Sequence, residues 1–301
     1  MHPRFKSRSQ SVSAAVLVAL IATALAAGCS TAAPQTPGSP PPAPSSAPNN
    51  GMNGMSGMGG MPMVSGNGLA DTVNGYTLTL RTPPATTIPA AATFTITHDG
   101  NTVTQFDPEQ TKLMHFYLIR SDLTGFQHVH PSMQPDGTWT APTSAVPAGD
   151  YRVYVQFVPH ADAAGGALTV SAPVTVPGSG ATAAAPLPAP GATTTVDGYT
   201  VALNGALAAG QEAPLTITIS RNGQPVTDLQ PYLDTYAHVT AIHQGDLAFA
   251  HLHPEGIVNG DHGGPALTVH ADLPAPGDYR MFIQFQTNNT LHTASITVTA
   301  S

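Results

Sequence analysis

The part of the sequence after about residue 70 is a tandem repeat, and this duplication constrains the fold more than any other feature. At an offset of 123 positions, and of 128 after a five-residue insertion in the second copy, the matching stretches are 73–77 with 196–200, 128–131 with 251–254, and 149–157 with 277–285. A repeated unit of ~105 residues has the size of an ordinary domain. We therefore predict two domains of the same fold, at residues 71–178 and 194–301, joined by a Pro/Ala/Gly-rich linker at 179–193.

Each copy is predicted to consist of β-strands. In the first copy, short runs rich in β-branched and aromatic residues alternate with turn residues; these runs are 76–81, 92–98, 113–120, 126–130, 151–158 and 168–176. Strands at this spacing indicate an antiparallel sandwich, and Gly149-Asp150-Tyr151 before the long late strand is similar to the tyrosine corner of immunoglobulin-like domains. The predicted fold class is all-β: two tandem immunoglobulin-like antiparallel β-sandwich domains.

The composition agrees with this prediction and excludes several functions. With 29 Gly, 30 Pro and only 9% charged residues, the chain favours strands joined by turns over long solvent-facing helices. A single Cys forms no intramolecular disulfide and no cysteine-rich zinc or iron–sulfur site. Nine Lys+Arg against seventeen Asp+Glu argue against a nucleic-acid partner.

The first 28 residues are predicted to be a lipoprotein signal peptide. Basic residues near the start precede sixteen uncharged residues at 12–27, a stretch shorter than the ~20 residues that span a bilayer. The segment Leu25-Ala26-Ala27-Gly28-Cys29 resembles a lipobox, with Ala26 where the usual Leu stands. We expect Cys29 to be acylated, which makes the cell membrane a partner and places the protein outside the cytoplasm; without lipidation the protein is secreted.

Residues 29–70 are predicted to be a disordered tether, because Pro, Gly, Ser, Asn and Met follow one another there without a strand or helix period. Thioether sulfur is a soft ligand that suits Cu(I), and the intervening Gly residues leave the backbone free to wrap an ion. The alternative is a plain low-complexity linker. The candidate soft-metal ligands of the tether are Met52, Met55, Met58, Met61 and Met63.

Histidines carry the chemistry that the sequence offers. Six of them occupy equivalent positions in the two copies: His115 and His238, His128 and His251, His130 and His253. In a strand, His-x-His places both imidazoles on one face, about 6.5–7 Å apart. One metal ion then takes both nitrogens at ~2.0–2.1 Å.

Hairpin registers bring the third histidine of each copy to the same place. In the second copy, a two-residue turn at Gly245-Asp246 sets His238 opposite His253. In the first copy, a loop at 122–123 sets His115 opposite His130. Each hairpin therefore presents three imidazoles as candidate metal ligands. The alternative is that these histidines are structural and bond backbone carbonyls.

Copper is the metal that best suits these ligands, with zinc as the alternative. Imidazole binds copper, zinc and nickel, and among the copper ions it suits Cu(II). A blue-copper centre needs a Cys thiolate, and Cys29 is assigned to the lipid. The Met-rich tether adds soft sulfur ligands for Cu(I), so copper is the expected cofactor.

A family resemblance covers both repeats. The pattern Asp-Leu-x-x-Phe-x-His-x-His-Pro at residues 122–131, followed by Pro-x-Gly-x-Tyr-Arg-x-x-x-x-Phe at 147–157, is similar to bacterial secreted proteins and lipoproteins often described as heavy-metal-binding. Their domains resemble immunoglobulin-like copper-resistance sandwiches. The resemblance implies metal binding, delivery or resistance outside the membrane, with a delivery partner that the sequence does not name.

Three functions remain open from the sequence. The first is a membrane-anchored copper-binding lipoprotein that is not an enzyme. The second is a structural or adhesive surface lipoprotein that binds no metal. The third is a metalloenzyme, because three histidines leave one coordination position open.

Overall fold

The computed structural model describes residues 67–88, 90–179 and 183–301. The predicted signal peptide, Cys29 and the five methionines of the tether lie outside the described residues. Within those ranges, no helix has both the length and the apolar character needed to cross a bilayer.

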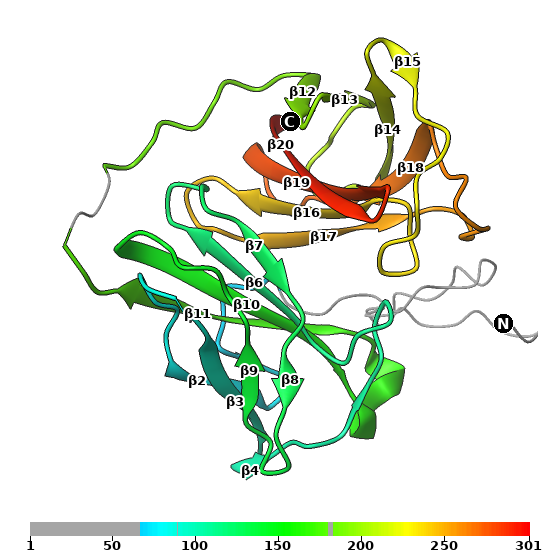
Figure 1. Cartoon of the computed structure of the whole chain (residues 1–301). Helices are drawn as coiled ribbons and strands as arrows, with labels where there is room; N and C mark the ends of the chain where they lie inside the picture. Colours follow the sequence, from blue (N-terminus) through cyan, green and yellow to red (C-terminus); the bar gives the residue numbers. More distant parts are fainter. Residues whose placement is uncertain (1–66, 89, 180–182) are drawn as a thin grey trace, which may run out of the picture. The chain divides into compact units, whose positions relative to one another are not determined.

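The first repeat is a sandwich of two antiparallel sheets (Figure 1). One sheet has the order β1-β2-β3-β9-β8 with β4 beside β3, and the other has the order β11-β10-β6-β7 with β5 beside β10. A short 3-10 helix, η1, follows β10. The bounds are β1 Thr72–Val73, β2 Tyr76–Thr82, β3 Ala92–His98, β4 Asn101–Thr102, β5 Phe106–Asp107, β6 His115–Arg120, β7 Gln127–Val129, β8 Ser132–Met133, β9 Trp139–Ala141, β10 Gly149–Pro159, η1 His160–Gly165 and β11 Leu168–Val176.

The second repeat has the same layers, but its strands form one continuous path, β12-β13-β14-β18-β17-β16-β19-β20, with β15 beside β14. Strand β17 joins the layers because it pairs with β16 along most of its length and with β18 at His253 and Pro254. The first repeat divides the corresponding segment into β7 and β8. The bounds are β12 Thr193–Val196, β13 Tyr199–Asn204, β14 Ala213–Arg221, β15 Gln224–Pro225, β16 His238–His243, β17 Phe249–Pro254, β18 Ala266–Ala271, β19 Gly277–Thr287 and β20 Thr290–Ala300.

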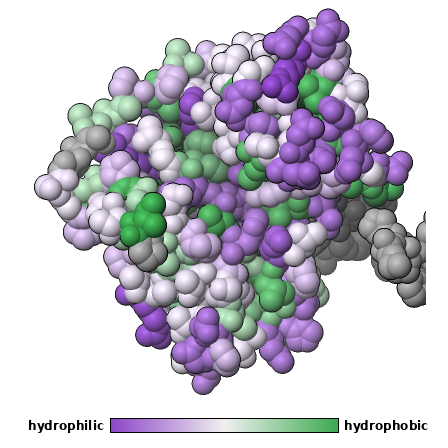
Figure 2. All heavy atoms as spheres, viewed as in Figure 1, coloured by the Kyte–Doolittle hydropathy of each residue, from purple (hydrophilic) through white to green (hydrophobic). Residues whose placement is uncertain are grey.

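Each sandwich has its own apolar core. In the first repeat, Phe94 of one sheet stacks on Phe116 of the other at 5.7 Å between ring centroids. The tyrosine corner is present in both repeats: Tyr151 Oη donates to Pro147 O, and Tyr279 Oη donates to Ala275 O, each at 2.9 Å. On the face seen in Figure 2, apolar residues reach the surface among hydrophilic ones.

A third apolar cluster joins the two repeats. Along β6, alternate residues such as Phe116 enter the core of the first repeat, so Tyr117 and Ile119 lie on the opposite face of the sheet. These two residues are buried with Ile242 and Phe282 of the second repeat. The outer faces of the β6–β10 and β16–β19 sheets therefore cover each other, and side chains there are withdrawn from water.

The predicted fold class is confirmed, and both hairpin registers are those expected from the sequence: the pairs Phe116–Val129 and Val239–Leu252 place the histidines as predicted. The predicted turns are wrong. The hairpin of the second repeat closes between His243 and Ala248, a four-residue loop rather than the two residues Gly245-Asp246. In the first repeat, Arg120 N bonds Thr124 O around a three-residue loop. The registers are still as predicted, because the alternation of core residues along the paired strands sets them more strongly than the turn does.

Candidate metal centre

Three histidines of the first repeat converge on one point. His115 begins β6, His128 lies in β7, and His130 follows that strand directly. The β6–β7 register places His115 opposite His130 and Tyr117 opposite His128. One ring nitrogen from each histidine lies within 4.8 Å of the other two. Two imidazole nitrogens on one ion are roughly 3.3–3.6 Å apart, given metal–nitrogen bonds of ~2.0–2.1 Å. The cluster therefore has nearly the dimensions of a three-histidine site.

Hydrogen bonds determine which nitrogen of each ring faces the cluster. His115 Nε2 is 2.9 Å from the backbone oxygen of Glu109, and His128 Nδ1 is 2.7 Å from Gln284 Oε1. Both oxygens are acceptors, so both of these nitrogens carry the hydrogen and donate. The other nitrogens, His115 Nδ1 and His128 Nε2, are 3.0 Å apart. In the neutral rings, two lone pairs point at each other.

Burial keeps these imidazoles neutral. It lowers the pKa of His115 to about 4, against the opposing effect of the Glu109 hydrogen bond, and repulsion from Lys112 lowers it further. Burial, with repulsion from His115, lowers the pKa of His130 to about 4 and that of His128 well below its ordinary value. At neutral pH the rings carry no proton that would bridge the two opposed lone pairs.

Histidines of the second repeat continue the cluster. The His238 ring lies 4.7 Å from the His128 ring and 4.6 Å from the His251 ring, measured between centroids. His238 Nε2 is 3.1 Å from Tyr117 Oη, whereas its buried Nδ1 has no hydrogen-bond partner. The side chain of His253 lies outside the described part of the chain. His238 and His251 of the second repeat thus lie beside the first cluster at one interface.

Sequence reasoning missed the residues that hold the rings. Gln284 comes from β19 of the second repeat and orients His128, and Glu109 contributes its backbone oxygen to His115. Tyr117 stacks on His128 with ring centroids 4.2 Å apart. The sequence did contain a signal for Gln284: both repeats carry Gln at this position, as Gln156 and Gln284, in strands of otherwise mostly apolar residues.

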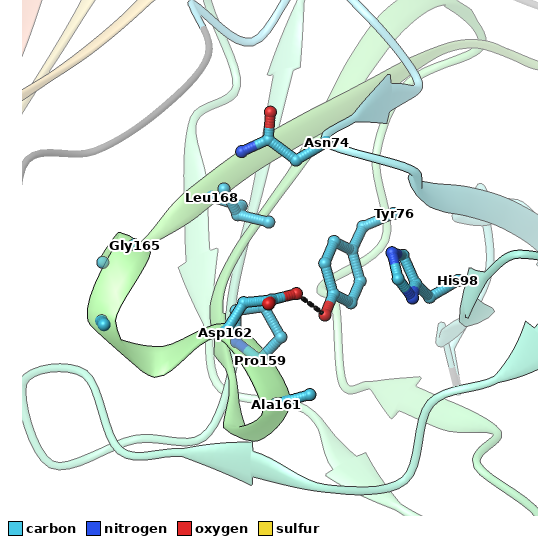
Figure 3. Close-up of a pocket in the computed structure, with 10 residues that line it drawn as sticks. Asn74, Tyr76, His98, Pro159, Ala161, Asp162, Gly165 and Leu168 are labelled. Carbon is cyan, nitrogen blue, oxygen red and sulfur yellow. Dashed lines mark hydrogen bonds between the residues drawn. The ribbon is translucent and has the colours of Figure 1, made fainter.

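A separate pocket of about 550 Å³ lies in the first repeat, away from the histidines described above (Figure 3). In it, Tyr76 Oη donates a hydrogen bond to the Asp162 carboxylate, and the Tyr76 ring stacks on the His98 ring. Burial and this carboxylate raise the pKa of Tyr76 to about 12. The second repeat has a different network at the corresponding tyrosine, in which His292 Nδ1 is 2.8 Å from Asp197. The surroundings of Tyr76 therefore differ from those of its counterpart Tyr199.

Comparison with known proteins places both repeats in one family. A family model matches residues 71–177 and 194–301. The chain belongs to this family, which is described as a domain of unknown function (DUF8832). The match supports the tandem organisation and names no metal. No curated protein matches the chain.

Solved structures resemble the chain in fold alone. Domains 4 and 5 of the S-layer protein SbsC are 17% identical, with a TM-score of 0.21, over 75% of this chain and 96% of that one. InvD of Yersinia pseudotuberculosis is 17% identical, with a TM-score of 0.23, over 76% of this chain and 58% of that one. The FN1–FN3 domains of chicken CNTN1 are 9% identical, with a TM-score of 0.22, over 74% and 65%. Likeness at this level says nothing about what this chain binds.

Proposed function

We propose that this protein is an extracytoplasmic copper-binding lipoprotein whose first repeat binds the ion through His115, His128 and His130. The observation that carries the proposal is the pair of ring nitrogens, His115 Nδ1 and His128 Nε2, that face each other at 3.0 Å while their ring partners donate to protein oxygens. Two opposed lone pairs repel, and a cation between them turns that repulsion into coordination. Metal-bound histidines commonly donate their second nitrogen to an oxygen in this way.

The ligand set favours a cation of low charge. The three side chains are neutral imidazoles, and within the described residues no Asp, Glu or Cys joins their group. The desolvation cost of an ion rises with the square of its charge, so a divalent ion costs roughly four times as much as a monovalent one. Cu(I) accepts imidazole ligands, whereas structural zinc is almost always four-coordinate. Copper therefore remains the expected metal, and zinc the alternative.

Anchoring and delivery are part of the same proposal. Acylated Cys29 would hold the protein at the outer face of the membrane, and the methionines at 52–63 would offer Cu(I) a soft first contact on the tether. The role is that of a binding or delivery protein rather than an enzyme. An activity screen on the copper-loaded protein tests this last point, because turnover that depends on the metal would contradict it.

The decisive experiment measures metal bound to the full-length protein in which the five tether methionines are replaced by Leu. Cu(I) is titrated without oxygen against a coloured Cu(I) chelator, and Zn(II) against a zinc dye. We expect Cu(I) to bind, and the His128→Asn variant to lose that ion. Copper that binds equally to parent and variant, or no metal binding at all, would contradict the proposal.

A second candidate is a structural or adhesive surface protein that binds no metal. It is favoured by the two hydrogen bonds that already use one nitrogen each of His115 and His128, and by the buried aromatic contact between the repeats. The S-layer protein among the structural neighbours is in keeping with it, although that likeness concerns the fold alone. It predicts that neither copper nor zinc raises the melting temperature, whereas a specific ligand would.

A further inference from the structure

The contact between the repeats has approximate two-fold symmetry. Phe126 of the first repeat stacks on Phe282 of the second at 4.0 Å, and Tyr154 packs against Phe249 at 5.2 Å. By the repeat offsets, Phe249 is the counterpart of Phe126, and Phe282 is the counterpart of Tyr154. A two-fold rotation therefore exchanges the two contacts, as in an isologous dimer.

The histidines lie about the same approximate axis. His115 and His238 are counterparts, and their rings are nearly parallel, 6° apart in plane and 6.0 Å between centroids. The symmetry relates the His128–Gln284 contact to a contact between His251 and Gln156. Strand pairing supports this relation, because Gln156 lies opposite His115 and Gln284 lies opposite His238.

The two glutamines differ in how far their bonds are satisfied. Gln284 accepts from His128 and donates to Thr293 Oγ1 at 3.4 Å. Gln156 is 0% exposed, yet neither of its amide atoms has a hydrogen-bond partner, and the same holds for Oγ1 of Thr169, its strand neighbour. Native proteins satisfy the large majority of buried polar atoms, so unpaired atoms at one place need an explanation.

His238 adds an unpaired nitrogen at the same interface. Its ring is 0% exposed, its Nδ1 has no hydrogen-bond partner, and its neighbours include the rings of both His128 and His251. In the first repeat, the equivalent atom is His115 Nδ1, which faces the proposed metal position. The unpaired His238 Nδ1 therefore corresponds to His115 Nδ1, which faces the proposed ion. The unpaired amide of Gln156 corresponds to that of Gln284, which bonds the ligand His128.

We propose that the interface holds a second copper ion, bound by His238 and His251, with Gln156 of the first repeat orienting His251 as Gln284 orients His128. This inference rests on the proposed function of the first cluster. Each repeat then supplies the ligands of one ion and a positioning residue for the other. Because the two ions repel each other, whichever binds later binds more weakly than it would alone.

The first test counts ions in the full-length protein with the tether methionines replaced by Leu. The parent is expected to bind two Cu(I) per chain, and His128→Asn and His251→Asn one each. A parent that binds a single ion, lost in His128→Asn and kept in His251→Asn, would overturn the second site and leave the first intact. A parent that binds no ion contradicts the proposed function and this inference together.

The second test does not depend on histidine variants folding. Gln156→Leu is expected to weaken the second ion roughly 10–100-fold and leave the first unchanged, with Gln284→Leu acting on the first. Gln156→Glu keeps an acceptor oxygen and should retain the affinity. The exposed Gln224, changed to Leu, is the matched control. A second ion bound equally well by Gln156→Leu and the parent would refute the positioning role.

Discussion

Acid is expected to destabilise the metal-free protein, and His115 allows the size of the effect to be worked out. Its pKa falls from an ordinary 6.5 to about 4 on folding, so the unfolded chain binds a proton more readily than the native one. The stabilisation is fully present above pH 6.5 and is lost as the pH falls toward 4. At pH 5 the loss from this one side chain is about 2 kcal/mol, and at lower pH about 3 kcal/mol.

The assay is urea unfolding of the chelator-treated protein at pH 7.5 and pH 5.0. The His115→Gln variant keeps a donor for the Glu109 carbonyl but has no titrating ring. We expect the difference in unfolding free energy between the two pH values to be about 2 kcal/mol smaller in this variant than in the parent. His262→Gln, at an exposed position, is the control and should match the parent. Equal pH dependence in parent and His115→Gln would refute the reasoning.

Three further predictions follow from the structure and the sequence. Phe282→Ala removes a ring that is 4% exposed and stacked on Phe126, so it should cost about 3–5 kcal/mol of unfolding free energy, measured in urea. Copper at 100 times the dissociation constant of the first site should stabilise the protein by about 2.7 kcal/mol through that site, seen as a higher melting temperature, and His128→Asn should lose this part of the stabilisation. Cys29→Ala should move the protein from the membrane fraction to the soluble extracytoplasmic fraction, measured by fractionation and immunoblotting.

Each of these predictions has a control. Leu291→Ala, at a position 39% exposed, should change the unfolding free energy by less than about 0.5 kcal/mol. A Phe282→Ala loss no larger than that would mean that the repeats do not pack through this ring. Copper stabilisation as large in His128→Asn as in the parent would place the first ion elsewhere, and a Cys29→Ala protein that stays with the membrane would rule out the lipid anchor.

The sequence predicted the local arrangement of the first cluster. The spacing of His128 and His130 sets one strand face, and the strands around the hairpin set His115 opposite His130, as observed. The predicted turns were wrong in both hairpins, yet the strand registers were as predicted. A slip of one residue would move every side chain to the other face of the sheet, so the alternation of core residues specifies the register more strongly than the turn does.

The partner of the outer sheet face was not predicted, although a signal was present. Strand β6 reads His-Phe-Tyr-Leu-Ile, with apolar residues on both faces, which is typical of a strand buried on both sides. This run indicates that Tyr117 and Ile119, on the face away from the core, are buried against another part of the protein. It does not say that Ile242 and Phe282 provide it, because that depends on which surface of the second repeat is complementary.

What the sequence alone determined is the duplication, the all-β fold and the three imidazoles that the hairpin of the first repeat gathers, because strand period and register act between near neighbours in the chain. What only the tertiary structure decided is that the two outer faces meet, that Gln284 reaches His128 from 156 positions away, and that burial holds the rings neutral. These features depend on the packing of one whole sandwich against another, and no local pattern of residues encodes that packing.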